Sequence, residues 1–257
     1  SRATHLEQLR KSEGSRAEAA VGGSSQSGTD TDTTQRAHLE RLKAEAYVSA
    51  GPEHPGSAAK ALTHVTRALA LLGRAEVSGA TRLGAGDSVL SRVRVVESGG
   101  TARDSAAWEF PGQDEWLQRF ASEGEAEEET PLQVVDELRC YLMRFELARL
   151  GSSVLSLRPA DAFAAAHAAA SIALAHRNPE HVATALAAAC IAANCQGWHD
   201  PAERLVDSAN AALTRCTSSR CIAQVRLMLA EYFLSHCAWD AAKACLDEAA
   251  ELFEDLG

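Results

Sequence analysis

The chain has 257 residues, a formal net charge of −10 and a sequence isoelectric point near 5.4. The acidic balance and the absence of a basic stripe exclude nucleic acid as the expected partner. Hydrophobic residues make up 46% of the chain but aromatic residues only 5%, and alanine is abundant. This composition favours close helix–helix packing over a β-sandwich, which needs more Val, Ile, Thr and aromatic residues.

All seven cysteines lie at or after Cys140, and their odd number argues against the disulfide framework of a secreted protein. We therefore expect a reducing intracellular compartment, the nucleus or the cytoplasm. The polar N-terminus predicts no secretory signal, and no run of about 18 large apolar residues predicts a membrane span. Because the chain begins at Ser1 rather than Met, we expect a fragment or a processed chain.

Residues 1–34 are predicted to form a flexible N-terminal segment and linker, because residues 21–34 are rich in Gly, Ser and Thr and lack apolar periodicity. A solvated tether is the main interpretation, and a phosphorylated or metal-binding role involving Asp30 and Asp32 is the alternative.

Residues 35–73 are predicted to form a first helical pair. The Gly- and Pro-rich residues 51–56 interrupt it, Ser57 can cap the second helix, and Gly73 can end it.

Residues 74–129 are predicted to be an irregular, partly disordered insertion. Residues 89–96 alternate in part and predict a short extended segment, and the Glu-rich residues 124–129 indicate a solvated loop. Four aromatic residues could anchor the insertion onto the helices: Trp108, Phe110, Trp116 and Phe120.

Residues 130–257 are predicted to form tetratricopeptide-like helical repeats. Thr130 with Pro131, and Asn178 with Pro179, place a capping residue before a proline at the first helical position. The first of these helices should end near Leu150 and its partner should span residues 160–176. Further starts are predicted at Asp200 with a capping box to Glu203, at Ser218 or Ser219, and at Asp240.

The second helices of successive pairs are thus predicted near Asp161, Asp200 and Asp240, which are 39 and 40 residues apart. Tetratricopeptide repeats have a period of about 34 residues, and armadillo and HEAT repeats of about 40–47. The last pair fits the tetratricopeptide pattern best. Its pattern residues are Leu229, Ala230, Phe233, Trp239, Ala242 at the helix contact, and Leu246 and Ala249 on the inner face.

The expected fold class is therefore all-α, with antiparallel helical hairpins stacked in a right-handed superhelix (an α-solenoid). Each hairpin buries its apolar face only by stacking on a neighbour, and such stacks usually serve as binding surfaces. Trp198 and Trp239 precede second helices, where packing at the turn is the main interpretation and ligand stacking the alternative.

The cysteines and histidines offer one candidate for metal binding. The pairs Cys190/Cys195 and Cys216/Cys221 have zinc-like spacing, and two histidines, His199 and His236, are candidates for the remaining ligands. Because cysteine also packs as a small apolar residue, packing is the main interpretation and no metal site is assigned.

Catalytic patterns are weak throughout the chain. Residues 84–87 hold a lone Gly-x-Gly that fits a turn better than a phosphate cradle, and Glu251 with Asp255 marks a solvated helix face. A helical active site that uses His167, His176 and His181 is a third hypothesis. No catalytic or cofactor-binding residue and no cofactor is assigned, and we expect no enzyme activity.

The order of segments resembles that of one family, the fifth subunit of the anaphase-promoting complex, a multi-subunit ubiquitin ligase of mitosis. The resemblance covers about two-thirds of the chain. The segments that carry it are residues 37–72, 138–150, 171–176, 180–186 and 201–212. The resemblance implies a non-catalytic scaffold that holds other protein subunits during cell-cycle control. The alternative is a regulatory repeat module that senses a peptide or ligand for an attached effector.

Overall fold

The computed structural model describes residues 27–49, 56–75, 130–155 and 159–256, and all regular structure in these ranges is helical. Over the described residues the chain is therefore all-α, which confirms the predicted class. None of the helices in these ranges offers an apolar stretch of the length that a lipid bilayer requires.

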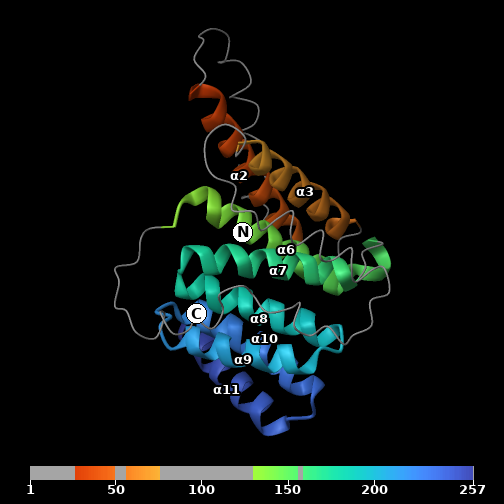
Figure 1. Cartoon of the computed structure of the whole chain (residues 1–257), viewed down its shortest axis with the longest axis vertical. Coiled ribbons are helices and arrows are strands. Elements are labelled where there is room, and N and C mark those ends of the chain that lie inside the picture. Colours follow the sequence, from red (N-terminus) through yellow and green to blue (C-terminus); the bar gives the residue numbers. More distant parts are fainter. Residues whose placement is uncertain (1–26, 50–55, 76–129, 156–158, 257) are drawn as a thin grey trace.

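The helices form an elongated stack that runs from α2 and α3 at one end to α11 at the other (Figure 1). α2 packs on α3, α6 on α7, α8 on α9, and α10 on α11, while α2 and α3 both lie against α6 and α8 contacts both α7 and α10. Their bounds are Ser27–Ser49 for α2, Ser57–Ala75 for α3, Leu132–Leu155 for α6, Pro159–His176 for α7, Pro179–Cys195 for α8, His199–Leu213 for α9, Ser219–Ser235 for α10 and Trp239–Leu256 for α11.

Alanine makes the centre of the stack dense. α8 is apolar nearly all round, and the helices that surround it leave most of its side chains without solvent contact. Small side chains let neighbouring helix axes approach closely, which is the packing that the composition predicted. Five alanines of α8 are fully buried: Ala183, Ala185, Ala187, Ala188 and Ala189.

Two predicted helix starts are confirmed by their caps. The Asn178 side-chain oxygen accepts hydrogen bonds from the N–H groups of Glu180 at 3.1 Å and His181 at 3.2 Å. The Ser218 hydroxyl accepts the Cys221 N–H at 3.3 Å. Each cap satisfies amide groups that the first turn of a helix leaves without an intrahelical partner.

The predicted capping box at Asp200 and Glu203 is wrong. α9 begins at His199, and the capping position is Trp198, two residues before Asp200; the Trp198 side chain makes no capping bond. The preceding turn decides this, because it places the Trp198 carbonyl where it accepts the Ala202 N–H at 3.1 Å.

The bounds of three other helices also differ from those predicted. α2 begins at Ser27, inside the segment predicted as linker, and α6 continues past Leu150 to Leu155. α3 passes through Gly73 and ends at Ala75, and its first backbone bond runs from the Lys60 N–H to the Gly56 carbonyl. The remainder of the predicted insertion, residues 76–129, lies outside the described residues, as do residues 1–26.

Candidate interaction surface

The two C-terminal hairpins turn in the same way, 40 positions apart. The Trp198 N–H and the Ala238 N–H each donate to the carbonyl five residues earlier, at 3.1 Å and 3.0 Å. The residue before each donor has a left-handed backbone, with φ of 76° at Gly197 and 55° at Cys237. This is the Schellman ending of a helix, in which a left-handed residue lets the last carbonyls find donors. Residues 40 apart are therefore structurally equivalent in these hairpins.

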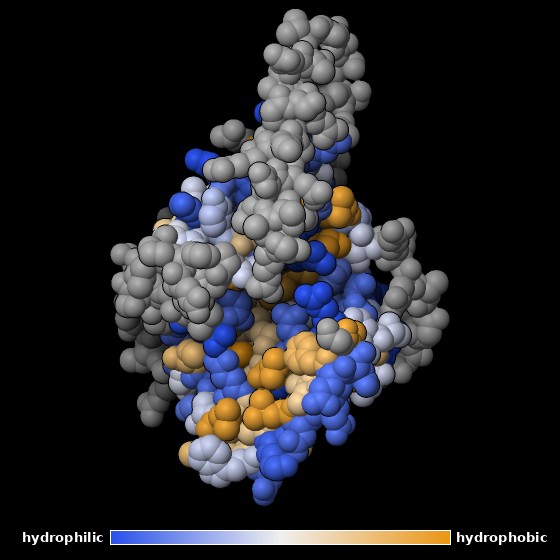
Figure 2. Space-filling model, turned by 180° about the vertical axis from the view of Figure 1, so that it is seen from behind, coloured by the Kyte–Doolittle hydropathy of each residue, from blue (hydrophilic) through white to orange (hydrophobic). Residues whose placement is uncertain are grey.

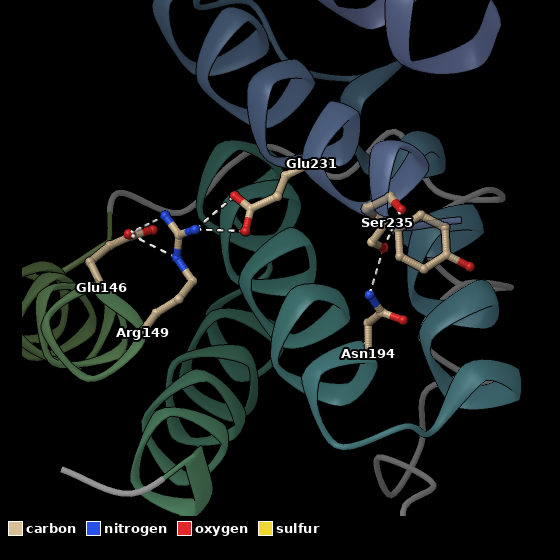
Figure 3. Close-up of polar contacts among 6 residues, drawn as sticks. Glu146, Arg149, Asn194, Glu231 and Ser235 are labelled. Atoms are coloured by element: carbon tan, nitrogen blue, oxygen red, sulfur yellow. Dashed lines mark hydrogen bonds and ion pairs between the residues drawn. The ribbon is translucent and has the colours of Figure 1, made fainter. Parts of the chain in front are cut away.

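α8 and α10 lie side by side and run in the same direction. Near their starts, the Glu180 carboxylate accepts the Ser218 N–H at 3.0 Å. Near their ends, the Asn194 amide donates to the Ser235 hydroxyl at 2.8 Å (Figure 3). The two helices are thus in contact at both their N-terminal and their C-terminal ends, so α10 covers one face of α8.

The equivalent face of α10 has no helix on it among the described residues. On α8, Thr184 contacts the Cys221 thiol at 3.5 Å and Asn194 contacts α10 as above. Forty positions later stand Gln224 and Leu234, and both are exposed. The side of α10 that repeats the covered side of α8 is thus open to solvent.

Exposed apolar residues of α10 and α11 repeat positions that are buried one hairpin earlier. In three equivalent pairs, the earlier residue is at most 6% exposed and the later one at least 40%. The pairs are Ala187 and Leu227, Val206 and Leu246, and Leu213 and Phe253.

We name the exposed Leu227, Leu234, Leu246 and Phe253 the α10–α11 surface. Leu227 and Leu234 are seven residues apart on α10, and Leu246 and Phe253 are seven apart on α11, so each pair lies along one helix face. Figure 2 shows hydrophobic residues gathered at the lower end of the molecule, the end at which Figure 1 places α11. Scattered exposed leucines are common on proteins, so it is the alignment of these residues in two rows that makes this surface a candidate for interaction.

Part of the last repeat was predicted wrongly. Ala242, expected at the helix contact, and Ala249, expected on the inner face, are both buried, but Leu246, also expected on the inner face, is 40% exposed. Trp198 packs edge-on against Phe163 with 4.9 Å between ring centroids, whereas Trp239 is 63% exposed. Trp239 is equivalent to the exposed His199 and not to Trp198, so a shift of one position turns its side chain outward.

The charges around the α10–α11 surface are mostly negative. α11 carries six carboxylates and one lysine, and Glu251 and Asp255 are solvated as expected. The lysine is neutralised locally, because Lys243 Nζ lies 2.6 Å from the Asp247 carboxylate. A partner with basic groups beside an apolar stripe would match this surface.

Arg149 links α6 to α10 across the stack (Figure 3). Its Nη1 atom contacts both carboxylate oxygens of Glu231, at 2.6 and 2.7 Å, and its Nη2 contacts Glu146 at 2.8 Å. Burial lowers the pKa of Arg149, but the hydrogen bonds and charges of Glu146 and Glu231 outweigh burial and leave the pKa raised. The pair joins helices that are far apart in the sequence.

Among the described residues, two charged side chains that are almost fully buried, Arg41 and Asp136, lie between α2 and α6. Arg41 Nε donates to the Asp136 carboxylate at 2.6 Å, with side chains only 3% and 1% exposed. His38 Nδ1 contacts the second Asp136 oxygen at 2.8 Å, and Arg41 also pairs with Glu45. Sequence analysis missed this network, because its partners are 95 positions apart and no local pattern joins them.

The candidate metal ligands do not converge in the part of the chain that the structure describes. No group of three or more His, Cys, Asp or Glu side chains there is arranged to hold a metal ion. His199 Nδ1 lies 3.3 Å from His236 Nε2 on the surface. Cys190 is buried, which raises the pKa of its thiol to about 12, while Cys195 is exposed.

The acidic and histidine candidates are also separated. Asp32 forms an exposed pair with Arg36 at 3.1 Å within α2. His176 and His181 flank the turn between α7 and α8, and burial followed by the charge of Arg139 lowers the pKa of His181. His167 is buried nine residues before His176, a rise of about 13 Å along α7, so the three imidazoles do not form one site.

One hollow lies between α2 and α3. It has a volume of about 390 Å³ and is lined by Arg36, Leu39, Glu40, Arg67, Ala70 and Leu71. Burial raises the pKa of Glu40, but hydrogen bonds from His64 and Lys43 outweigh this effect and leave the pKa lowered. The hollow therefore has an apolar floor with charged groups around it.

Comparisons with protein-family models, with curated proteins and with solved structures found no match to the chain. The resemblance to the anaphase-promoting-complex subunit therefore stays a prediction.

Proposed function

We propose that this chain is a non-catalytic protein–protein interaction module built from tetratricopeptide-like hairpins stacked in a right-handed superhelix. The observation that carries the proposal is the α10–α11 surface. Three of its four apolar residues, Leu227, Leu246 and Phe253, occupy positions that are buried one hairpin earlier, and they stay exposed here. A helical hairpin buries its apolar face by stacking, so this face fits a helix from a partner.

The energy that such a partner could gain is moderate. A fully exposed Leu or Phe gains roughly 1.5–3 kcal/mol on burial, so side chains already more than half buried gain about 1 kcal/mol each. Four such residues supply a small apolar centre, around which the acidic residues of α11 add charge complementarity. We expect the partner helix to carry a row of apolar residues flanked by Lys or Arg.

The family resemblance suggests which assembly the module would belong to, the anaphase-promoting complex. The partner would be another subunit of the anaphase-promoting complex, and the module would hold subunits together in the nucleus or cytoplasm. The acidic surface also fits basic partners in other multi-subunit assemblies, so the assembly and the surface are tested separately.

The experiment is affinity purification of the tagged protein from its own cells, with mass spectrometry of the co-purified proteins. A variant that combines Leu227→Glu with Leu246→Glu should lose the main partner at least tenfold, because two charges would enter an apolar contact. The matched control combines Val48→Glu with Leu132→Glu, two similarly exposed residues outside the surface, and should keep the partner.

The outcomes separate the two parts of the proposal. Recovery of cullin-like and RING subunits with the unchanged protein supports the ubiquitin-ligase assembly. A different stable complex that is lost in the double variant keeps the interaction surface and rejects the assembly. Equal recovery with both double variants rejects the α10–α11 surface.

The alternative function is a ligand-sensing regulatory module, and the hollow between α2 and α3 is the observation that favours it. A small ligand with an apolar body could lie against Leu39 and Leu71, with an anionic group near Arg36 or Arg67. A metabolite mixture screened by thermal shift would reveal such a ligand. Arg67→Ala should abolish the shift, and a screen without any shift would reject this alternative.

A further inference from the structure

Two histidines from neighbouring hairpins meet at the surface. His199 begins α9, and His236 directly follows the last residue of α10. Their imidazoles form an edge-to-face pair with 5.3 Å between ring centroids and 3.3 Å between His199 Nδ1 and His236 Nε2. The two nitrogens therefore lie on the facing sides of the rings. The larger Cys and His site that the sequence offered as a candidate is not formed among the described residues, but these two of its members are in contact.

The surrounding residues hold His236 in one orientation. Its Nδ1 atom lies 3.0 Å from the Tyr232 carbonyl oxygen and 3.1 Å from the Ser235 hydroxyl. That hydroxyl donates to the Tyr232 carbonyl at 2.6 Å and accepts from the Asn194 amide at 2.8 Å (Figure 3). The His236 ring also packs against the buried Tyr232 ring, with 4.4 Å between centroids. The imidazole is thus positioned by its own helix and by α8.

These contacts fix the tautomer of neutral His236. A carbonyl oxygen can only accept a hydrogen bond, and the Ser235 proton is already donated to Tyr232, so Nδ1 must carry the imidazole proton. Nε2 then has a lone pair, and this atom is the one that faces His199. Metal-binding histidines in proteins show the same arrangement, in which one ring nitrogen donates to a backbone carbonyl and the other binds the metal.

The separation of the two nitrogens also suits a single metal ion. Zinc binds imidazole nitrogen at about 2.0–2.1 Å, and two such bonds to atoms 3.3 Å apart enclose roughly 107°, close to the tetrahedral angle. His199 is exposed, so its ring can turn until both lone pairs point to one position. The same separation permits an N–H···N hydrogen bond from His199 to His236. Metal binding then requires that the His199 proton move from Nδ1 to Nε2.

We propose that His199 and His236 form a binding site for one divalent transition metal ion such as Zn²⁺. Imidazole nitrogen suits Zn²⁺, Ni²⁺ and Cu²⁺, whereas Mg²⁺ and Ca²⁺ require oxygen ligands. No third His, Cys, Asp or Glu side chain joins the pair in the part of the chain that the structure describes. Water, or a side chain of another protein, completes the coordination.

The metal ion would link two hairpins. His199 belongs to the α8–α9 hairpin and His236 to the α10–α11 hairpin. Forty positions away, the equivalents of these residues are Trp239 and Gln196, so the pair is a property of this junction and not of the repeat. An ion that binds both imidazoles binds only the folded chain with the two hairpins in contact, and it therefore stabilises that contact by mass action.

Zinc binding to the full chain is measured by isothermal titration calorimetry. We expect one site with a micromolar dissociation constant. X-ray absorption at the zinc edge should show nitrogen and oxygen ligands at about 2.0–2.1 Å and no sulfur at about 2.3 Å. His199→Ala and His236→Ala should each weaken the affinity roughly tenfold or more, because each removes one of only two protein ligands.

Two control variants separate the imidazoles from other ligands. His176→Gln removes a histidine at a different turn, and Cys237→Ser removes the exposed thiol next to His236. Both should bind zinc like the unchanged protein. His199→Ala is the decisive variant, because its ring is exposed while His236 also packs on Tyr232. Zinc should slow hydrogen exchange at the end of α10 in the unchanged protein and not in His199→Ala, and far-UV circular dichroism checks that both are folded.

Three results would overturn the proposal. They are binding that needs millimolar zinc, sulfur among the zinc ligands, and a zinc affinity that does not change in His199→Ala. Each of them would leave the pair as a hydrogen bond between two surface histidines.

Discussion

The α2–α3 hairpin and the α10–α11 hairpin lie at opposite ends of the stack (Figure 1) and attach to it by different means. The first meets α6 through buried charges, with Arg41 and Asp136 paired at 2.6 Å, beside a small apolar cluster that includes Cys140 and Leu147 of α6. The second meets α8 through a close apolar contact with polar bonds at its two ends, such as Asn194 to Ser235.

The two kinds of junction differ in how strictly they select the helix that packs there. A buried ion pair costs desolvation energy, and a partner that lacks the matching charge would leave the other charge unpaired. An alanine-rich contact makes no such demand and accepts any helix with a suitable apolar row. The charged junction therefore fixes one hairpin to α6, whereas the apolar contact is the kind of junction that the proposed partner helix would continue.

The largest loss of stability is expected for Asp136→Asn, which tests the charged junction. The variant removes the buried carboxylate from Arg41 and leaves it only the partly exposed Glu45, and removal of one partner from a buried pair typically costs about 3–5 kcal/mol. We expect that loss in urea unfolding, and early hydrogen exchange in α2 and α3. Asp32→Asn, at an exposed pair of α2, is the control and should change stability by less than about 0.5 kcal/mol. Equal effects of the two variants would contradict a fixing role for the buried charges.

The apolar contact is tested by Ala187→Leu. Ala187 is fully buried in α8, and its equivalent in α10 is the exposed Leu227. Overpacking at the buried site should cost about 1–3 kcal/mol, whereas Leu227→Ala should cost much less. Thermal unfolding of both variants measures the difference. A tolerated leucine at position 187 would show that the contact is loose and would weaken the comparison of covered and open faces.

The contrast between the two junctions also shows what the sequence could predict. The helix starts at Asn178 with Pro179 and at Ser218 were predictable, because capping signals act within one turn. The Arg41–Asp136 pair was not predictable, because its partners lie on helices that meet only in the folded chain.

The sequence predicted which residues of α11 are apolar, but not which of them stay exposed, because exposure depends on contacts between helices. The pattern of the last repeat located the apolar residues of α11, but the pattern does not say which of two apolar rows is covered. Ala242 and Ala249 face α10, while Leu246 belongs to the second, open row. Trp239 was predicted to pack because it precedes the last helix, as Trp198 precedes α9. It lies one position later than the equivalent of Trp198, and its side chain therefore points to solvent.

The two junctions should respond alike to alkaline pH. Cys140 lies at the charged junction and Cys190 in the apolar core, and burial raises the pKa of both from 9.0 to about 12. The unfolded thiol ionises first, so stability is intact below about pH 9 and falls as the pH rises toward 12. At pH 10 each thiol should account for about 1 kcal/mol of the loss.

Cys140→Ala and Cys190→Ala provide the measurement. Each variant loses some stability at pH 7 through its smaller side chain, but its stability should decline less than that of the unchanged protein between pH 8 and 10. Parallel pH curves for a variant and the unchanged protein would mean that the thiol is not protected from ionisation. If the decline of stability with pH becomes smaller in Cys190→Ala but not in Cys140→Ala, the charges near Cys140 alter the titration of its thiol.

The smallest effect is expected at Arg149, where the two kinds of attachment combine. Arg149 joins α6 to α10 by a charge pair, but Glu231 is nearly half exposed, so solvent screens the contact. Exposed pairs usually contribute less than about 1 kcal/mol, and a double-mutant cycle of Arg149→Met and Glu231→Gln should give a coupling of about 0.5 kcal/mol that falls with added salt. A coupling of several kcal/mol would mean that charge also fixes the C-terminal hairpin, and the α10–α11 end would then be as selective as the α2–α3 end. A small coupling leaves apolar packing as its main attachment, as the proposed docking of a partner helix beside it requires.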